Sequence, residues 1–152
     1  MRVEEVMTQD TKTCRPDDSL SRAAQIMWDG DCGCVPVVDA AGKAVGMITD
    51  RDICMAAYTR GQVLSEMTVA SVCSPRVVGV DPGESVGSAE RLMREYKVRR
   101  LPAVDRQGRV VGIVSMNDLA RKCAGSGRGN ADTEGVVRTL AAIGTPGAQA
   151  IA

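Results

Sequence analysis

The 152-residue chain contains no histidine and no phenylalanine. Histidine is the commonest catalytic base and a frequent metal ligand, so its absence argues against much of enzyme chemistry. Trp28, Tyr58 and Tyr96 are the only aromatic residues, too few to form a stacking platform for single-stranded nucleic acid. Valine, isoleucine, leucine, methionine and alanine must therefore build the core.

The chain also lacks an excess of charge and a long apolar run. Lys+Arg and Asp+Glu both number 19, so no bulk charge favours nucleic acid. No apolar stretch reaches the roughly 18 residues of a membrane span, and the N-terminus has no pattern of a secretory signal. We therefore expect a cytoplasmic protein, without membrane or nucleic-acid partners, whose six cysteines are reduced thiols.

What the chain does contain is a repeat with a constant shift of 66 residues. Twelve of the 49 paired positions from Val6 to Cys54 are identical without a gap. Unrelated segments of ordinary composition would agree at about 3 of them. Each copy is too small to bury much core alone, whereas two copies packed face to face could share one. A duplicated supersecondary unit is therefore the starting premise.

Both copies predict the element order β-α-β-β-α. Apolar residues at three- and four-residue spacing predict the first helix, and tight turns predict a strand pair after it. The expected strands are 11–14, 35–39 and 44–48 in the first copy and 77–80, 101–105 and 110–114 in the second. The fold class is α/β in the α+β sense, with two pseudo-symmetric repeats packed sheet to sheet as one module.

The repeats set the expected domain boundaries. Residues 1–64 form the first repeat with its linker, and residues 65–124 form the second. Residues 125–152 are expected to be a flexible linker, a short helix over 136–143 and a tail.

The motif that carries chemistry is the junction from strand to second helix, at 46–52 and again at 112–118. A hydroxyl residue, Thr49 or Ser115, stands where it can cap the helix, and a helix start also favours an anion. A carboxylate three residues later, Asp52 or Asp118, can accept the hydroxyl hydrogens of a ribose. The alternative is that these residues only cap and complement the helix dipole.

The duplicated pattern resembles a tandem pair of cystathionine-β-synthase-type (CBS) domains over about residues 1–123. The resemblance rests on the Gly-h-h-Thr/Ser-x-x-Asp endings, on the strands with Pro36 and Pro102, and on the element order. It implies a module with two pseudo-symmetric clefts for adenosine-containing ligands such as AMP, ADP, ATP, S-adenosylmethionine or NAD. It also implies that two modules often pair into a flat disc.

The resemblance assigns roles residue by residue. Asp52 and Asp118 would hold ribose hydroxyls, while Thr49 and Ser115 would bind phosphate. The backbone at 12–13 and 78–79 would face adenine, and the apolar strand starts at 35–36 and 101–102 would contact the other side of the adenine ring. The implied nucleotide-binding residues are Lys12, Thr13, Val35, Pro36, Thr49, Asp50, Asp52, Val78, Gly79, Arg99, Arg100, Leu101, Pro102, Ser115, Asn117 and Asp118.

The two copies differ before the second strand. Arg99 and Arg100 stand where copy one has Gly33 and Cys34, and arginine forks suit phosphate oxygens. This difference predicts unequal sites, with the phosphorylated ligand favoured in the Asp118 cleft. The alternative is that the two arginines are a solvated surface pair.

Cys32 and Cys34 invite a metal or redox interpretation. Zinc usually needs four ligands, and no second cysteine pair or histidine is near in the sequence. A redox-responsive pair and ordinary core or cleft-lining thiols remain open, and the latter are favoured. No metal and no obligatory cofactor is expected.

No catalytic constellation is visible, so we expect a stand-alone regulatory module without catalysis. It would sense AMP, ADP or ATP as an energy or metabolite signal, pair as a homodimer and act on a separate, unknown protein. The alternatives are a structural interaction protein with vestigial clefts, a binder of S-adenosylmethionine or NAD, and a weak nucleotide hydrolase, the least favoured.

Overall fold

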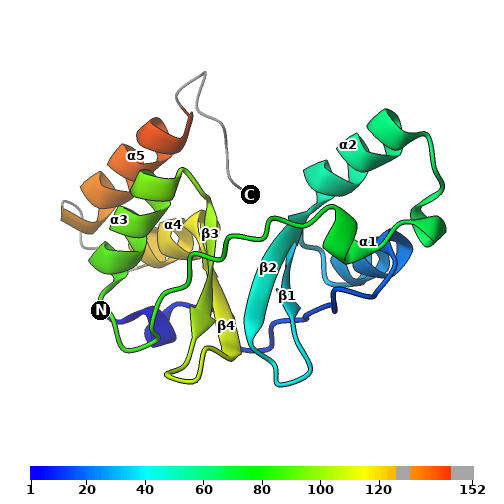
Figure 1. Cartoon of the computed structure of the whole chain (residues 1–152). Coiled ribbons are helices and arrows are strands. Elements are labelled where there is room, and N and C mark those ends of the chain that lie inside the picture. Colours follow the sequence, from blue (N-terminus) through cyan, green and yellow to red (C-terminus); the bar gives the residue numbers. More distant parts are fainter. Residues whose placement is uncertain (126–130, 145–152) are drawn as a thin grey trace. The chain divides into compact units, whose positions relative to one another are not determined.

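The computed structural model describes residues 1–125 and 131–144, and they form two compact units (Figure 1). We call them the repeat-1 unit, Thr11–Val77 with Gln107–Val110, and the repeat-2 unit, Met1–Asp10, Val78–Arg106 and the described residues between Val111 and Gly144. Each contains a two-stranded antiparallel sheet with helices, which confirms the predicted α+β class.

The repeat-1 unit contains α1 (Leu20–Asp29), β1 (Cys34–Val38), β2 (Ala44–Thr49) and α2 (Asp50–Arg60). Ser19 caps the N-terminus of helix α1, because its side-chain oxygen accepts a hydrogen bond from the Arg22 amide. The strands pair antiparallel, and Gly42 takes a φ of +79° in the turn between them, a conformation that favours glycine. Helix α2 is capped at its C-terminus by Gly61, whose backbone is in the left-handed conformation.

The repeat-2 unit repeats this order with α3 (Val86–Tyr96), β3 (Arg100–Val104), β4 (Val110–Ser115) and α4 (Met116–Gly125). A fifth helix, α5 (Ala131–Gly144), begins five residues before the expected 136–143 segment. The expected linker at 126–130 and the tail after 144 lie outside the described residues.

Each unit has its own apolar core between sheet and helices. In the repeat-1 unit the core includes the fully buried Leu20, Val35 and Ile48. In the repeat-2 unit Leu101 and Met93 are fully buried, and Val136 of α5 belongs to the same cluster. The core is aliphatic, as the absence of phenylalanine requires.

The expected first strand of each copy is wrong. The segments 11–14 and 77–80 form only single bridges, Cys14 to Val37 and Val80 to Ala103, both parallel. In the first copy, a single residue makes both hydrogen bonds of the bridge. The Cys14 amide donates to the Pro36 carbonyl at 3.1 Å, and the Cys14 carbonyl accepts from the Val38 amide at 2.9 Å. The ladder extends no further because a proline follows two residues later, at 16 and 82, and proline has no N–H to donate.

The segment that leads into each copy packs on the other copy's unit. The short 3₁₀ turn η1 (Val3–Glu5) belongs to the repeat-2 unit, where Thr8 pairs with Ile113. Two further turns, η2 (Leu64–Glu66) and η3 (Val69–Ser71), belong to the repeat-1 unit. The compact units therefore do not follow the expected boundary between residues 64 and 65.

Two glycines make this packing possible. A Cβ on Gly46 would lie 2.8 Å from the Ser74 carbonyl oxygen, and one on Gly112 would lie 2.9 Å from the Thr8 carbonyl oxygen. Both distances are too short for a side chain, so the glycine in each junction motif allows the backbone of another segment to approach closely.

Candidate functional site

The junction of β2 and α2 forms a closed capping box in the repeat-1 unit. Asp52 Oδ2 accepts from the Thr49 amide at 2.9 Å and from the Thr49 hydroxyl at 2.8 Å. The Asp52 amide in turn donates to Thr49 Oγ1 at 3.1 Å. Asp52 is half-buried and turned back onto the helix start.

The junction of β4 and α4 has the same geometry in the repeat-2 unit. Asp118 Oδ2 accepts from the Ser115 amide at 2.8 Å and from its hydroxyl at 2.6 Å, and the Asp118 amide donates to Ser115 Oγ at 3.2 Å. Asp118 is only 8% exposed, and its Oδ1 accepts from Arg121. Capping is therefore confirmed at both junctions, while a carboxylate has acceptor capacity for further donors.

The loop before the middle strand is tied to each junction in the same register. The Asp50 amide donates to the Gly33 carbonyl at 3.1 Å, and the Met116 amide donates to the Arg99 carbonyl at 3.0 Å. The side chain of Asp50 also lies over Gly33, because a Cβ there would be 2.8 Å from Asp50 Oδ2. Backbone geometry around the junction is thus duplicated even where the side chains differ.

The strand residues of the expected sites are buried, and the residues before them are more accessible. Val35 and Pro36 lie in β1, and Leu101 and Pro102 lie in β3, all buried. The backbone edges expected for adenine lie in irregular chain just before each bridge residue, and of these only Lys12 has an exposed side chain. The others are the half-buried Thr13, Val78 and Gly79.

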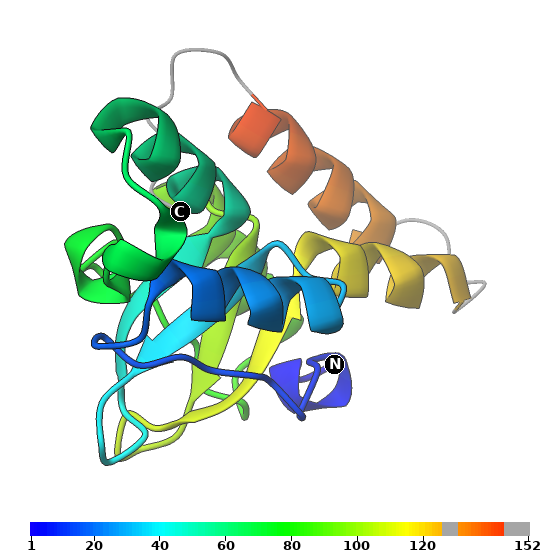
Figure 2. The ribbon, with the colours of Figure 1, turned by 90° about the vertical axis from the view of Figure 1, so that its right-hand side faces the viewer.

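A cavity of about 250 Å³ lies beside Asp118, lined also by Glu5, Val6, Arg121 and Lys122. Figure 2 shows the turn η1, in dark blue, near the start of α4 that carries Asp118. Sequence reasoning missed the two cations, although their spacing of three and four residues from Asp118 places them one helical turn on.

The arginines that were expected to make the two sites unequal do not line this cavity. Arg99 is exposed and Arg100 half-buried, and neither is among the residues that line the cavity beside Asp118. Arg121 and Lys122 line it, and the repeat shift places uncharged Met55 and Ala56 at the corresponding positions of α2.

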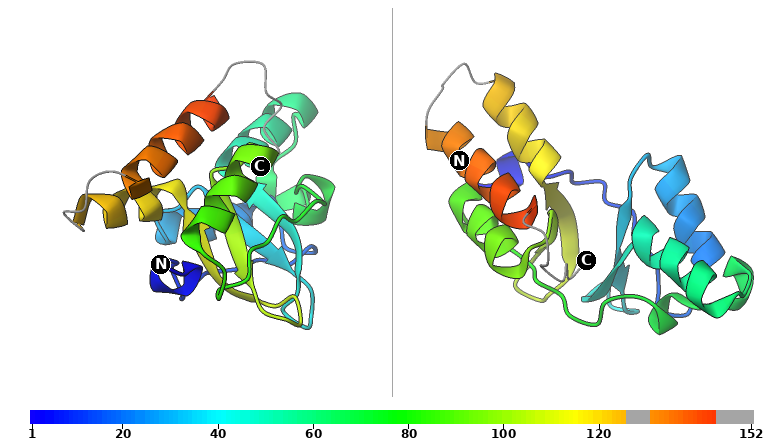
Figure 3. Two further views of the ribbon diagram at one scale, coloured as in Figure 1. Left: turned by 90° about the vertical axis from the view of Figure 1, so that its left-hand side faces the viewer. Right: turned by 90° about the horizontal axis from the view of Figure 1, so that it is seen from above.

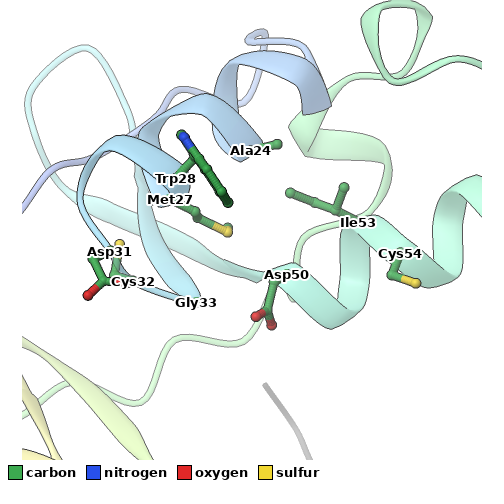
Figure 4. A pocket seen from close by; sticks show the side chains of 9 residues that line it. All are labelled: Ala24, Met27, Trp28, Asp31, Cys32, Gly33, Asp50, Ile53 and Cys54. Carbon is green, nitrogen blue, oxygen red and sulfur yellow. The ribbon is translucent and has the colours of Figure 1, made fainter.

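A larger cavity of about 480 Å³ belongs to the repeat-1 unit and lies between α1 and α2 (Figure 4). Of the expected site residues it contains only Asp50; Thr49 and Asp52 do not line it. The other expected polar residue, Asn117, is exposed at the start of α4. The lining residues are Ala24, Met27, Trp28, Asp31, Cys32, Gly33, Asp50, Ile53 and Cys54.

The thiols of the repeat-1 unit differ in accessibility. Burial raises the pKa of Cys14 to about 12, and the Asp18 carboxylate and Cys73 add to the rise. Burial, and then the Asp52 carboxylate, raise the pKa of Cys73. Cys32 is exposed whereas Cys34 is buried in β1, so the two sulfurs have opposite environments, which favours separate thiols over a redox pair. None of the six cysteines, all of which lie in the described part of the chain, forms a disulfide.

Within residues 1–125 and 131–144, no three histidine, cysteine, aspartate or glutamate side chains are grouped so that they could hold a metal ion. No helix there is long and apolar enough to cross a membrane.

The paired junctions and duplicated units define a class. A family model described as "CBS domain" matches residues 3–58 and 69–125, so the chain belongs to the CBS domain family and carries two such domains. Among curated proteins it is 37% identical to the CBS domain-containing protein YhcV of Bacillus subtilis, over 78% of this chain and 82% of that protein. It is 32% identical to the inosine-5'-monophosphate dehydrogenase of Mycobacterium bovis over 96% of this chain, which spans only 26% of that enzyme.

Solved structures show the same fold. The CBS domain pair of protein MJ0100, in complex with 5'-methylthioadenosine and S-adenosyl-L-methionine, matches with a TM-score of 0.75 and 29% identity, over 82% of this chain and 97% of that one. CBSX2 in complex with AMP matches with a TM-score of 0.73 and 26% identity, over 84% and 98%. Both of these similar proteins hold adenosine-containing ligands.

Proposed function

We propose that this protein is a regulatory module that binds an adenosine-containing nucleotide and performs no catalysis itself. The observation that carries the proposal is the duplicated junction, in which a carboxylate one turn into a helix is fixed by the capping hydroxyl residue. In the repeat-2 unit this carboxylate, Asp118, is nearly buried and borders a cavity that is also lined by Glu5, Arg121 and Lys122. A buried carboxylate with spare acceptor capacity and adjacent cations suits a ligand that carries both hydroxyl and phosphate groups.

In this proposal Asp118 and Asp52 accept the hydroxyl hydrogens of the ribose. Each carboxylate is already oriented by two hydrogen bonds from its own cap residue, so binding a sugar costs little reordering. The hydroxyls of Ser115 and Thr49 and the helix starts behind them then face the phosphate. The backbone before each bridge residue contacts the adenine, against the apolar strand starts.

The cations of α4 make the repeat-2 site the stronger one for a phosphorylated ligand. Arg121 already pairs with Asp118, so it holds the carboxylate in place as it contributes positive charge to the cavity. Lys122 adds a second positive charge, whereas Met55 and Ala56 contribute none in the repeat-1 unit. AMP, ADP and ATP are therefore the favoured ligands there, and S-adenosylmethionine or NAD the runners-up.

Isothermal titration with AMP, ADP, ATP, S-adenosylmethionine and NAD tests the proposal. We expect Asp118→Asn to weaken binding of the preferred nucleotide by about tenfold, because a charge-assisted hydrogen bond is lost. Asp52→Asn should weaken that binding less. Asp17→Asn is the matched control, because the Asp17 side chain is 84% exposed and lies outside both junctions.

The outcomes separate the alternatives. If no adenosine compound binds at millimolar concentration, the sensor proposal fails and a structural role with vestigial clefts takes its place. If Asp52→Asn has the larger effect, the assignment of the stronger site to repeat 2 is wrong. Thermal unfolding of each variant without ligand shows whether the fold is intact, so that lost binding is not confused with lost folding.

A further inference from the structure

The 480 Å³ cavity between α1 and α2 has an apolar side and an acidic side. Met27 and Ile53 line it with side chains that are otherwise buried, and Trp28, which is 87% exposed, lies beside them. In the view of Figure 4 these three side chains gather on one side of the cavity, and the carboxylates of Asp31 and Asp50 lie on the other. Sites for small molecules commonly have volumes of about 300–1,000 Å³, so a cavity of this size can hold one.

The charge of the cavity is negative. Of the described residues that line it, only Asp31 and Asp50 carry a charge, and both are exposed. The Asp50 carboxylate accepts a hydrogen bond of 2.8 Å from the Arg51 amide and has acceptor capacity for further donors. A positive charge is attracted both to carboxylates and to the face of an indole such as that of Trp28. The lining therefore favours a ligand that is cationic at one end and apolar at the other.

Repeat 2 has positive charges at two of the corresponding positions. The repeat shift places Lys97 where repeat 1 has Asp31, and Arg94 where it has Trp28. Asp31 and Lys97 both have a positive φ, of 46° and 54°, which is uncommon for residues other than glycine. The two repeats thus share this unusual backbone conformation and carry opposite charges on it. The acidic character of the cavity is a property of repeat 1 alone.

Helix α5 takes the corresponding place in the repeat-2 unit. It packs on both α3 and α4 (Figure 3). A Cβ on Gly135 of α5 would lie 2.5 Å from Glu90 Oε2, so the helix lies directly against this side chain. Glu90 stands where repeat 1 has Ala24, which lines the cavity. The repeat-1 unit therefore has a cavity at a position that the chain itself fills in repeat 2.

We propose that this cavity is a further binding site, for an organic amine with an apolar body. The protonated nitrogen lies against the carboxylates of Asp31 and Asp50, and the hydrocarbon part covers Met27, Ile53 and the indole of Trp28. An ammonium group suits the acidic side because it has only donors and no acceptor. Thr49 and Asp52 do not line the cavity, so the site is separate from the capped junction and the proposal does not depend on nucleotide binding.

Isothermal titration of the full chain with three probes of similar shape tests the preference for a cation. The ions 2-phenylethylammonium and 3-phenylpropanoate and the neutral 2-phenylethanol share a phenyl group on a two-carbon chain and differ in charge. We expect the ammonium ion to bind about tenfold more tightly than the alcohol, and the carboxylate to show no binding. Emission of Trp28, the single tryptophan, should change with the same midpoint as the heat signal. Equal affinities for the ammonium ion and the alcohol, or no binding of the ammonium ion at millimolar concentration, would overturn the proposal.

Variants of Asp31 test where the amine binds. Asp31→Asn keeps the size of the side chain and tolerates a positive φ, and it should weaken binding of 2-phenylethylammonium by about fivefold because a charged partner is lost. Asp31→Lys installs the residue of repeat 2, and it should abolish that binding and allow 3-phenylpropanoate to bind instead. Asp17→Asn is the control, because the Asp17 side chain is 84% exposed and does not line the cavity. Urea unfolding of each variant without probe shows whether the fold is intact. An unchanged affinity for 2-phenylethylammonium in both folded Asp31 variants would reject this cavity as the binding site.

Discussion

The two repeats carry the same junction but surround it with different chemistry. Thr49 with Asp52, and Ser115 with Asp118, form equivalent capping boxes within a few tenths of an ångström. Around them, the repeat-1 unit contains five of the six cysteines and the exposed Trp28, while the repeat-2 unit has Arg121 and Lys122 beside its junction and the additional helix α5. Duplication preserved the backbone scaffold, and the side chains that line its surfaces diverged.

The close backbone approach is the feature the two repeats share most strictly, and breaking it should have the largest effect. We expect Gly112→Ala and Gly46→Ala each to lower the free energy of unfolding by about 1–3 kcal/mol, because the new methyl group meets a backbone oxygen at under 3 Å. Chemical denaturation measures the loss. Gly87→Ala in α3 is the control, since its Cβ would have no contact shorter than 3.7 Å. Tolerance of one junction substitution and not the other would show that the two approaches are not equivalent.

Arg121 and Lys122, which stand where repeat 1 has Met55 and Ala56, are the sharpest difference between the repeats. We expect Lys122→Ala to weaken binding of a phosphorylated nucleotide several-fold at low salt and less at high salt, because exposed charges are screened. Arg121→Ala should do more, since it also releases Asp118. The counterpart variant Met55→Ala should leave nucleotide affinity unchanged. Calorimetric titrations at two ionic strengths measure all three affinities. If Met55→Ala and Lys122→Ala lower the nucleotide affinity equally, the two sites do not differ in the way proposed.

An effect that appears only at alkaline pH concerns a thiol that repeat 2 replaces with an apolar residue. Cys14 corresponds to Val80, and its pKa in the fold is raised from 9.0 to about 12. Between these values the unfolded chain ionises the thiol while the folded chain keeps it protonated. The stability contributed by the neutral thiol is therefore complete below pH 9 and declines as the pH rises toward 12.

Unfolding by urea from pH 8 to pH 10.5 measures this decline. Cys14→Val, which installs the residue of the other repeat, should remove this thiol's share of the decline. Cys54→Val controls for the other alkaline titrations, because Cys54 is exposed. An identical pH profile for Cys14→Val and the native chain would show that the thiol does not titrate differently in the two states.

Most of the local structure could be predicted from the sequence, because it depends on residues close together in the chain. The helices after Ser19 and Ser85 and the capping at Thr49 and Ser115 follow from residues within one turn of each other. The leading strands were mispredicted because the prolines at 16 and 82, which were interpreted only as helix entries, also remove the N–H that a longer ladder would need. The ligand contacts of the site residues stay predictions.

The sequence by itself determined the duplication, the order of helices and strands, and the capped junction with its carboxylate. Only the tertiary structure decided that each leading segment packs on the other copy's unit, that Arg121 and Lys122 border the cavity beside Asp118, and that α5 covers one helical face while Trp28 is left exposed on the other. The physical reason is that these features come from packing between segments far apart in the chain, where shape and burial select the partner. Hydrophobic periodicity reports which face of a helix is buried, but not what buries it.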